Sequence, residues 1–292
     1  MNGATADRTI LVVSPVSGGG RALRASRQVH DVLVAQGRSP ELVITESGDH
    51  AESVAAGAGP SDLVVSLGGD GLHSRVAAGA VRGRAVVAPL PGGRGNDFVR
   101  ALRVPQDARA AAEALSVATQ RRVDVGRVGD RHFVGVASVG FDSVANTIAN
   151  ETTWLAGPLV YAWGGLRALL ATRPRSFHIT VDGERRSLVG LNVAVGNSGR
   201  YGGGVRICPS AELDDGHLDL VTVAHVSRAA FARILLHTLP GTHLSRPGVC
   251  TGRARTVHID ADEPLVLFAD GDPVAVLPVE ITCEPGALRV LA

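Results

Sequence analysis

The chain has 292 residues, 45% of them hydrophobic, and a formal net charge of +1, so it is long enough for two domains and carries no strong field toward nucleic acid. Aromatic residues make up only 3%, which argues against a base-stacking platform. All 29 basic residues are arginine, which excludes a Walker-A NTPase and lysine Schiff-base chemistry.

Strands and helices alternate over the first 119 residues. Apolar runs predict strands at 10–13, 42–45, 63–67 and 85–88, and helical periodicity follows at 23–36, 51–58, 72–81 and 107–118. Asp107, after a proline, is a suitable N-cap. The alternation predicts a doubly wound parallel sheet with helices on both faces.

Glycine-rich loops follow three of these strands, at 14–20, 68–71 and 91–97. Carboxyl ends of parallel strands share one edge of a sheet, so these loops are expected to line one crevice. Asp70 and Asp97 lie among the glycines. A carboxylate beside phosphates indicates a bridging divalent cation or a proton acceptor. For a single loop, the alternative is a tight turn before a helix.

The pattern changes near residue 120. A hairpin is predicted from 121–128 and 132–140 around Gly129-Asp130, followed by an apolar helical segment at 141–172. That segment either packs on a sheet, lines an apolar substrate or rests on a membrane surface. Beyond it, a helix is predicted at 228–239, and short strands predict an antiparallel sandwich: 177–181, 187–195, 218–223, 256–260, 265–268, 279–283 and 288–291.

Compartment and partners follow from simpler signals. Cys208, Cys250 and Cys283 are separated and match no zinc spacing, which favours a reducing compartment. No signal peptide or membrane-spanning run is found, so we expect a cytoplasmic protein or one peripheral at the inner membrane face. An exposed sheet edge would also allow a homodimer.

The order of the motifs SPVSGGG, GGDG, GGRGNDFVR, VDVG, VGFD, LDDGHLD and ADGDP resembles the diacylglycerol kinase catalytic family, the bacterial lipid kinases related to sphingosine kinases. The resemblance covers nearly the whole chain. It implies an NAD-kinase- or phosphofructokinase-like nucleotide domain at 1–119 and a β-sandwich lipid-substrate domain at 120–285, with a last strand at about 286–292 returning to the first. It also implies ATP-dependent phosphorylation of a hydroxyl of diacylglycerol or a similar lipid with Mg²⁺, and transient contact with a membrane surface.

The resemblance also assigns residues. Around the nucleotide it places Ser14, Ser17, Gly18, Thr45, Gly68, Gly69, Gly71, Ser74, Gly93, Arg94, Gly95 and Asn96. Around a catalytic Mg²⁺, through water, it places Asp70, Asp97, Asp124 and Asp270, with Asp272 as the proton acceptor. A second, structural Mg²⁺ would be held by the Asp215 side chain and the carbonyls of Glu212 and His217. For that turn, the alternative is an Asp-Gly turn without metal.

Six positions depart from the family pattern, and the first is Ser14, where the family favours Asn. Leu72, Ser74 and Arg75 replace a Thr and an Asn-Glu pair, Arg94 replaces a Thr, and Asp272 replaces the usual Glu. Arg94 is either a phosphate clamp or a solvated surface residue. These departures keep two alternatives open, an NAD-kinase-like small-molecule kinase and a catalytically weak homologue that binds nucleotide or lipid. Phosphate incorporation into lipid or NAD would separate them.

Overall fold

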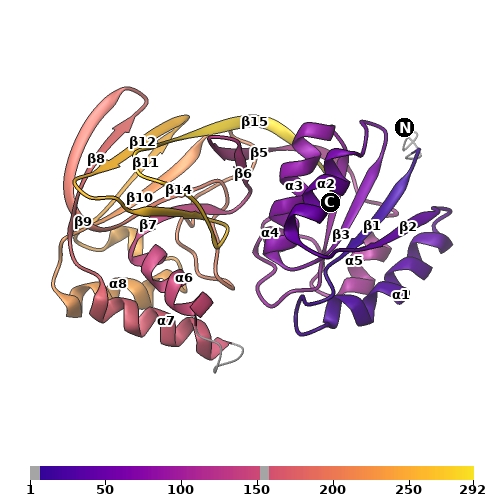
Figure 1. Ribbon diagram of the computed structural model, residues 1–292, viewed down its shortest axis with the longest axis horizontal. Helices are drawn as coiled ribbons and strands as arrows, with labels where there is room; N and C mark the ends of the chain where they lie inside the picture. The colour runs from indigo at the N-terminus through magenta and orange to yellow at the C-terminus, as the bar shows by residue number, and fades with distance from the viewer. Residues whose placement is uncertain (1–6, 152–157) are drawn as a thin grey trace. The chain divides into compact units, whose positions relative to one another are not determined.

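The computed structural model describes residues 7–151 and 158–292, and side chains outside 149–162. The described chain divides into two compact units (Figure 1). Unit 1 comprises residues up to 125 together with 285–292, and unit 2 comprises residues 126–284. The predicted boundary at 119 lies a few residues before this division, which falls within strand β5, Gln120–Val128.

Unit 1 contains a parallel sheet in the order β15-β4-β3-β1-β2. The strands are β1 Thr9–Val13, β2 Pro40–Ile44, β3 Leu63–Gly68, β4 Val86–Pro91 and the last part of β15 Val279–Leu291. Strands β1 and β3 are buried along their whole length, as expected for inner strands covered by helices on both faces. Because β15 pairs with β4, the C-terminus completes the N-terminal sheet.

Helices cover both faces of this sheet: α1 Arg21–Ala35, α2 Gly48–Ala56, α3 Asp70–Gly83, α4 Asp97–Ala101 and α5 Ala108–Ala114. Helix α1 packs with α5, and α2 packs with α3 on the other side (Figure 1). Asp107 is the N-cap of α5, as predicted, accepting from Ala110 N at 2.9 Å. Helix α5 ends earlier than predicted, where the Ser116 hydroxyl binds the Glu113 carbonyl.

Unit 2 is an antiparallel, sandwich-like array built around the long strand β9. Strand β9 pairs with β8 along its first half and lies between β7 and β10 along its second half. The core includes Phe133, Phe177, Ile259 and Leu267. The strands are β6 Arg131–Phe133, β7 Val136–Gly140, β8 Arg175–Val181, β9 Glu184–Gly196, β10 Leu218–Ala224, β11 Val249–Ala254, β12 Thr256–Ala261, β13 Val266–Ala269 and β14 Asp272–Val276.

The strand predictions need three corrections. The run 132–140 is broken after β6, and β7 joins β9 and β13 instead of continuing the hairpin. The predicted strands 279–283 and 288–291 form one strand, β15, which passes through Pro285 and Gly286. Strands β11 and β14 were not predicted, because their exposed residues, a glycine and a proline give no alternating apolar signal.

The predicted helical segment 141–172 contains two helices, α6 Phe141–Glu151 and α7 Pro158–Ala171, and its residues 152–157 lie outside the described part. Helix α8 is Arg228–Thr238, and a 3-10 turn follows at His243–Ser245. Phe141 and Phe231 meet edge to face at 5.0 Å and join α6 to α8. None of the helices in the described residues has the length and apolar character needed to cross a bilayer.

Candidate active site

The glycine-rich loops of unit 1 meet at the carboxyl ends of β1, β3 and β4. The β4 loop is bonded to the β3 loop by Gly92 N, which donates to Gly68 O at 2.7 Å. The β1 loop reaches the same place, because the Ser17 hydroxyl accepts from Gly69 N at 3.2 Å. The three loops therefore form one surface, as their positions after neighbouring strands predict.

The glycines themselves explain how closely these loops pack. A Cβ on Gly93 would lie 2.4 Å from Gly69 Cα, and one on Gly18 would lie 2.4 Å from Gly92 O. Real side chains do not fit at such distances, so these positions must be glycine for the loops to stack backbone on backbone. Gly71 differs, since nothing lies within 4 Å of its added Cβ. Gly71, like Gly19 in the β1 loop, therefore has open space beside it.

Asp70 connects two of the loops through its carboxylate. It opens α3, and its Oδ1 accepts from Phe98 N at 3.2 Å, in the first turn of α4. Burial raises the pKa of Asp70, while backbone amides of Phe98, Asp97 and Asn96 favour its ionised form. Asp97, buried in the first turn of α4, is a second carboxylate at this junction.

Two further side chains hold the third loop. Asn96 adopts a left-handed backbone conformation, φ 54°, and its Oδ1 accepts from Gly93 N at 2.9 Å. Arg21, at the start of α1, donates to Gly93 O at 2.8 Å and to Gly18 O at 3.3 Å. Sequence reasoning did not select Arg21; its only signal is its place directly after the SGGG run.

The departures from the family pattern in this region have structural partners. Leu72 is buried against Gly68, where any Cβ would collide with its side chain. Arg75 pairs with Asp49 at 3.1 Å and with Glu52 at 3.2 Å, tying α3 to α2. Arg94 is exposed, and Ser74 is half-buried. Arg75 thus has a structural role at a position where the family has an acidic residue.

His73 is a buried polar residue that the sequence analysis also passed over. Its Nδ1 lies 2.9 Å from the Ser66 hydroxyl, between α3 and β3. Burial lowers the pKa of His73 to about 4, so the ring is neutral near pH 7. His73 lies one helical turn after Asp70, and Ser66 lies in β3, so the pair belongs to the two elements that carry this loop.

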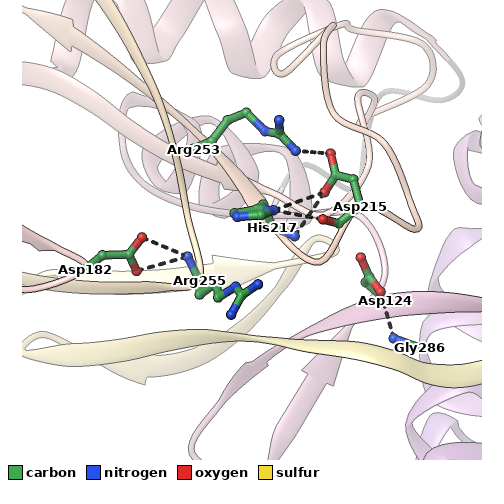
Figure 2. A network of polar contacts seen from close by, with 7 residues as sticks. All are labelled: Asp124, Asp182, Asp215, His217, Arg253, Arg255 and Gly286. Atoms are coloured by element: carbon green, nitrogen blue, oxygen red, sulfur yellow. Dashed lines mark hydrogen bonds and ion pairs between the residues drawn. The ribbon is translucent and has the colours of Figure 1, made fainter.

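Thr45 lies at the same edge of the sheet as the loops, directly after β2, whereas Asp124 lies in β5. The Thr45 hydroxyl donates to Val13 O at 3.2 Å, at the end of β1. Asp124, buried in β5, accepts from Gly286 N at 2.7 Å (Figure 2), and Arg122 donates to Gly286 O at 3.0 Å. Asp124 therefore anchors the returning strand β15, a contact that the sequence did not predict.

Asp270 is held by a row of backbone amides in unit 2. Its Oδ2 accepts from Val134 N at 2.9 Å, and its Oδ1 accepts from Gly135 N at 2.8 Å and from Val136 N at 3.2 Å. An added Cβ at Gly135 would lie 2.4 Å from Asp270 Oδ1, so a larger residue there would displace this carboxylate from its amides. Asp272, two residues on, is exposed where β14 begins.

The turn predicted for a structural metal lies before β10 in unit 2. Asp215 Oδ1 accepts from His217 N at 2.9 Å, and its Oδ2 pairs with the Arg253 guanidinium (Figure 2). Glu212 is exposed. Within the described part of the chain, no three His, Cys, Asp or Glu side chains gather closely enough to hold a metal ion.

Unit 2 also contains a buried carboxyl network at the start of α6. Asn192 Nδ2 donates to Asp142 Oδ2 at 2.7 Å, and Asn192 Oδ1 accepts from Asp142 N at 3.1 Å. Burial raises the pKa of Asp142. Hydrogen bonds from Asn192, Tyr201 and Ser138 lower it, but by less than burial raises it. The VGFD motif signalled this aspartate, but nothing in the sequence indicated its partners.

Comparison with known proteins identifies relatives along the whole chain. Residues 8–128 match the model of the diacylglycerol kinase catalytic domain, and residues 135–292 match the YegS C-terminal NAD kinase beta sandwich-like domain. A diacylglycerol kinase of Mycobacterium tuberculosis is 33% identical over 96% of this chain and 93% of its own. One of Bacillus subtilis is 28% identical over 75% of this chain and 74% of its own. A solved structure of a diacylglycerol kinase from Bacillus anthracis superposes with a TM-score of 0.82 over 98% of this chain and 96% of that chain, at 24% identity, which supports the fold.

Proposed function

The chain belongs to the diacylglycerol kinase catalytic domain family, and from this premise we propose that it transfers the γ-phosphoryl group of ATP to a hydroxyl of diacylglycerol or a similar lipid. The observation that carries the proposal is the surface of three glycine-rich loops with the Asp70 carboxylate at their junction. Phosphoryl transfer needs little covalent chemistry from the protein and depends on positioning and electrostatics. A surface fixed backbone to backbone supplies that positioning.

The nucleotide phosphates lie over the loop surface in this proposal. Backbone amides near Gly71 meet them, since that position has open space, and the start of α3 favours negative charge. The exposed Arg94 lies in the third loop, from which its guanidinium can reach a phosphate. The remaining assigned contacts are Ser14, Ser17, Gly18, Thr45, Gly68, Gly69, Ser74, Gly93, Gly95 and Asn96.

The proposed residues around Mg²⁺ are Asp70 and Asp97 in unit 1, with Asp124 and, from unit 2, Asp270 acting through water. Carboxylate oxygens are the ligands that Mg²⁺ prefers, and Mg²⁺ keeps several of its waters, so this donor set fits the ion. Each carboxylate already accepting an amide can still accept from a bound water, because every oxygen has two lone pairs. When bound, the ion offsets the charge that develops on the transferring phosphoryl group.

Asp272 is the proposed proton acceptor for the lipid hydroxyl. Its exposure where β14 begins leaves it accessible to substrate, and Asp270, two residues earlier, fixes the turn that carries it. It is one methylene shorter than the glutamate usual in the family, so the hydroxyl has to come closer to the backbone. Asp272→Glu should therefore change the rate of transfer without changing ATP affinity.

The apolar helices of unit 2 are the proposed contact with lipid. Leu166 and Leu170 of α7 are 55% and 57% exposed, and Leu236 and Leu239 near the end of α8 are 70% and 62% exposed. Neither helix contains Asp or Glu, whereas both carry arginine. Exposed leucines beside arginines favour the interface of an anionic bilayer.

The edge strand β2, with exposed Leu42 and Ile44, supports a proposed homodimer.

The test of the activity is transfer of label from [γ-³²P]ATP in the presence of Mg²⁺. A total lipid extract, pure diacylglycerol in mixed micelles and NAD serve as separate acceptors, and the labelled product is identified by mass spectrometry. We expect label in a lipid monophosphate. Label in NAD alone, or tight ATP binding without transfer to any acceptor, would overturn the proposal in favour of one of the two alternatives.

The test of lipid contact is sedimentation with liposomes of phosphatidylglycerol or phosphatidylcholine. We expect binding to the anionic liposomes and weaker binding of Leu166→Glu with Leu170→Glu, because the charges oppose insertion. Val117→Glu is the matched control, an exposed apolar residue of unit 1. Equal binding of the double variant and the control variant would exclude α7 as the contact.

A further inference from the structure

Both carboxylate oxygens and the carbonyl oxygen of Asp215 have partners within the protein. One carboxylate oxygen accepts from His217 N, the other pairs with the Arg253 guanidinium, and the Asp215 carbonyl accepts from His217 Nδ1 at 2.8 Å (Figure 2). A carbonyl oxygen can only accept, so Nδ1 of this ring carries the proton. Three contacts therefore close the turn from within.

Arg253 reaches the turn from the neighbouring strand. Strand β11 pairs antiparallel with β10, and the register places Arg253 opposite Asp219. Asp219 is buried, and its Oδ1 accepts from the Ser210 hydroxyl at 2.7 Å. One guanidinium thus lies beside two carboxylates.

The charges around this turn need a cation. Asp215 pairs with the Arg253 guanidinium, Asp219 lies opposite Arg253 in the strand register, and Glu212 is exposed in the same turn. Carboxylates in one turn repel one another, and a positive charge beside them offsets that repulsion. Arg253 supplies such a charge at any physiological pH, because its guanidinium does not lose its proton.

The residues present do not fit the structural Mg²⁺ that the family resemblance implies. The Asp215 carboxylate would have to ligate the ion, but its Oδ2 already pairs with a guanidinium. A divalent cation placed there would also lie next to the fixed positive charge of Arg253 and be repelled by it. The ion could enter only if Arg253 moved away.

We infer that the Arg253 guanidinium takes the place of a structural divalent cation at the 212–217 turn, so that this turn of the protein folds without metal. The guanidinium forms a charge-assisted bond to Asp215 and balances the acidic cluster from the adjacent strand. Its side chain is 52% exposed, so a variant without the charge would open the site to a hydrated cation. The turn is then metal-independent in the native chain and metal-dependent once Arg253 is replaced.

The experiment measures thermal unfolding of the full-length protein in EDTA and in MgCl₂, without nucleotide. For the native chain we expect the same Tm in both buffers. For Arg253→Gln we expect a Tm lower by at least about 2 °C in EDTA, with much of the loss recovered in MgCl₂. Arg255→Gln is the matched control, since the Arg255 backbone, not its guanidinium, binds Asp182 (Figure 2).

Two further variants keep the inference falsifiable. Arg253→Lys retains a positive charge and should behave as the native chain, even if Arg253→Gln does not fold. Adding Asp215→Asn to Arg253→Gln should abolish the recovery in MgCl₂, which separates this turn from Mg²⁺ binding at the proposed active site. A native chain that loses stability in EDTA, or an Arg253→Gln variant as stable as the native chain in EDTA, would overturn the inference. None of these readouts requires turnover, so they are independent of the proposed kinase activity.

Discussion

The two units hold their candidate functional carboxylates in different ways. In unit 1 the loops are fixed by backbone packing between glycines, and the Asp70 carboxylate adds one hydrogen bond, from Phe98 N, beside the amides of Asp97 and Asn96. In unit 2 the Asp270 carboxylate is itself what holds the chain, because it accepts from three successive amides. Charge can therefore be removed at Asp70 with the loop frame intact, whereas at Asp270 the same change removes a structural support.

The largest effect expected from this comparison is on phosphoryl transfer in Asp70→Asn. Asparagine keeps an oxygen that can accept from Phe98 N, so the Tm should change by less than about 2 °C, as for a surface substitution. The negative charge is lost, and we expect the transfer rate to fall by at least about 10²-fold. Initial rates and thermal unfolding measure the two effects. Asp31→Asn, an exposed change on α1, is the control, and a near-native rate in Asp70→Asn would refute the role of Asp70.

The next effect is a dependence of unit 1 stability on pH through His73. Its pKa is about 4 in the folded state and 6.5 in the unfolded chain, so the unfolded chain binds the proton first on acidification. The free energy of unfolding should be unaffected above pH 6.5 and should fall by about 3 kcal/mol between pH 6.5 and 4. Urea unfolding at several pH values, with hydrogen exchange in α3 as the readout, measures the slope of the unfolding free energy against pH.

His73→Leu with Ser66→Ala should remove that slope while replacing both members of the buried polar pair. Buried carboxyls act in the opposite direction. Because burial raises the pKa values of Asp70 in unit 1 and Asp142 in unit 2, each contributes more stability at acid pH and loses it as pH rises. The contribution of His73 should therefore be taken as the pH slope of the native chain minus the pH slope of the double variant. An unchanged slope in the double variant would contradict the assignment to His73.

The substitution Asp270→Asn tests the other side of the comparison. An asparagine side chain offers one acceptor oxygen where two are used, and its NH₂ group would face an amide N–H of the 134–136 segment. We expect unit 2 to lose about 2 kcal/mol of stability, unlike unit 1 in Asp70→Asn. Hydrogen exchange at residues 134–136 measures the loss directly. Equal stability of the two asparagine variants would break the proposed distinction.

Much of this architecture could be predicted because its signals are local. The alternation of apolar runs and glycine loops before residue 120 gave the parallel sheet, and the motif order gave the family, both of which the comparisons and the structure confirm. The hairpin turn at Asp182-Gly183 is a further local signal, since an Asp-Gly pair suits the positive φ angles found there.

What the sequence could not provide were contacts between distant segments. Asp124 binds the amide of Gly286, and Asp270 binds the amides of residues 134–136, so each carboxylate meets a partner more than a hundred residues away. Backbone amides carry no sequence signature, and a pattern of side chains cannot show which amides a carboxylate will meet. For the same reason the sequence could not show that Gly18, Gly69, Gly92 and Gly93 each pack against another loop.

Substitutions at two glycines of unit 1 distinguish a glycine that packs against another loop from one that has open space beside it. Gly93→Ala places a Cβ 2.4 Å from Gly69 Cα, so the loops must move apart, and we expect a loss of about 1–3 kcal/mol in stability. Gly71→Ala meets nothing within 4 Å and lies in α3, so stability should be unchanged or raised by at most about 1 kcal/mol. If phosphates approach the Gly71 amide, the same methyl group should weaken ATP binding by about tenfold or more, which calorimetry can measure. A Gly71→Ala variant that binds ATP as the native chain does would leave Gly71 as a helix residue only, and the open space above α3 would have to be assigned to something other than the triphosphate.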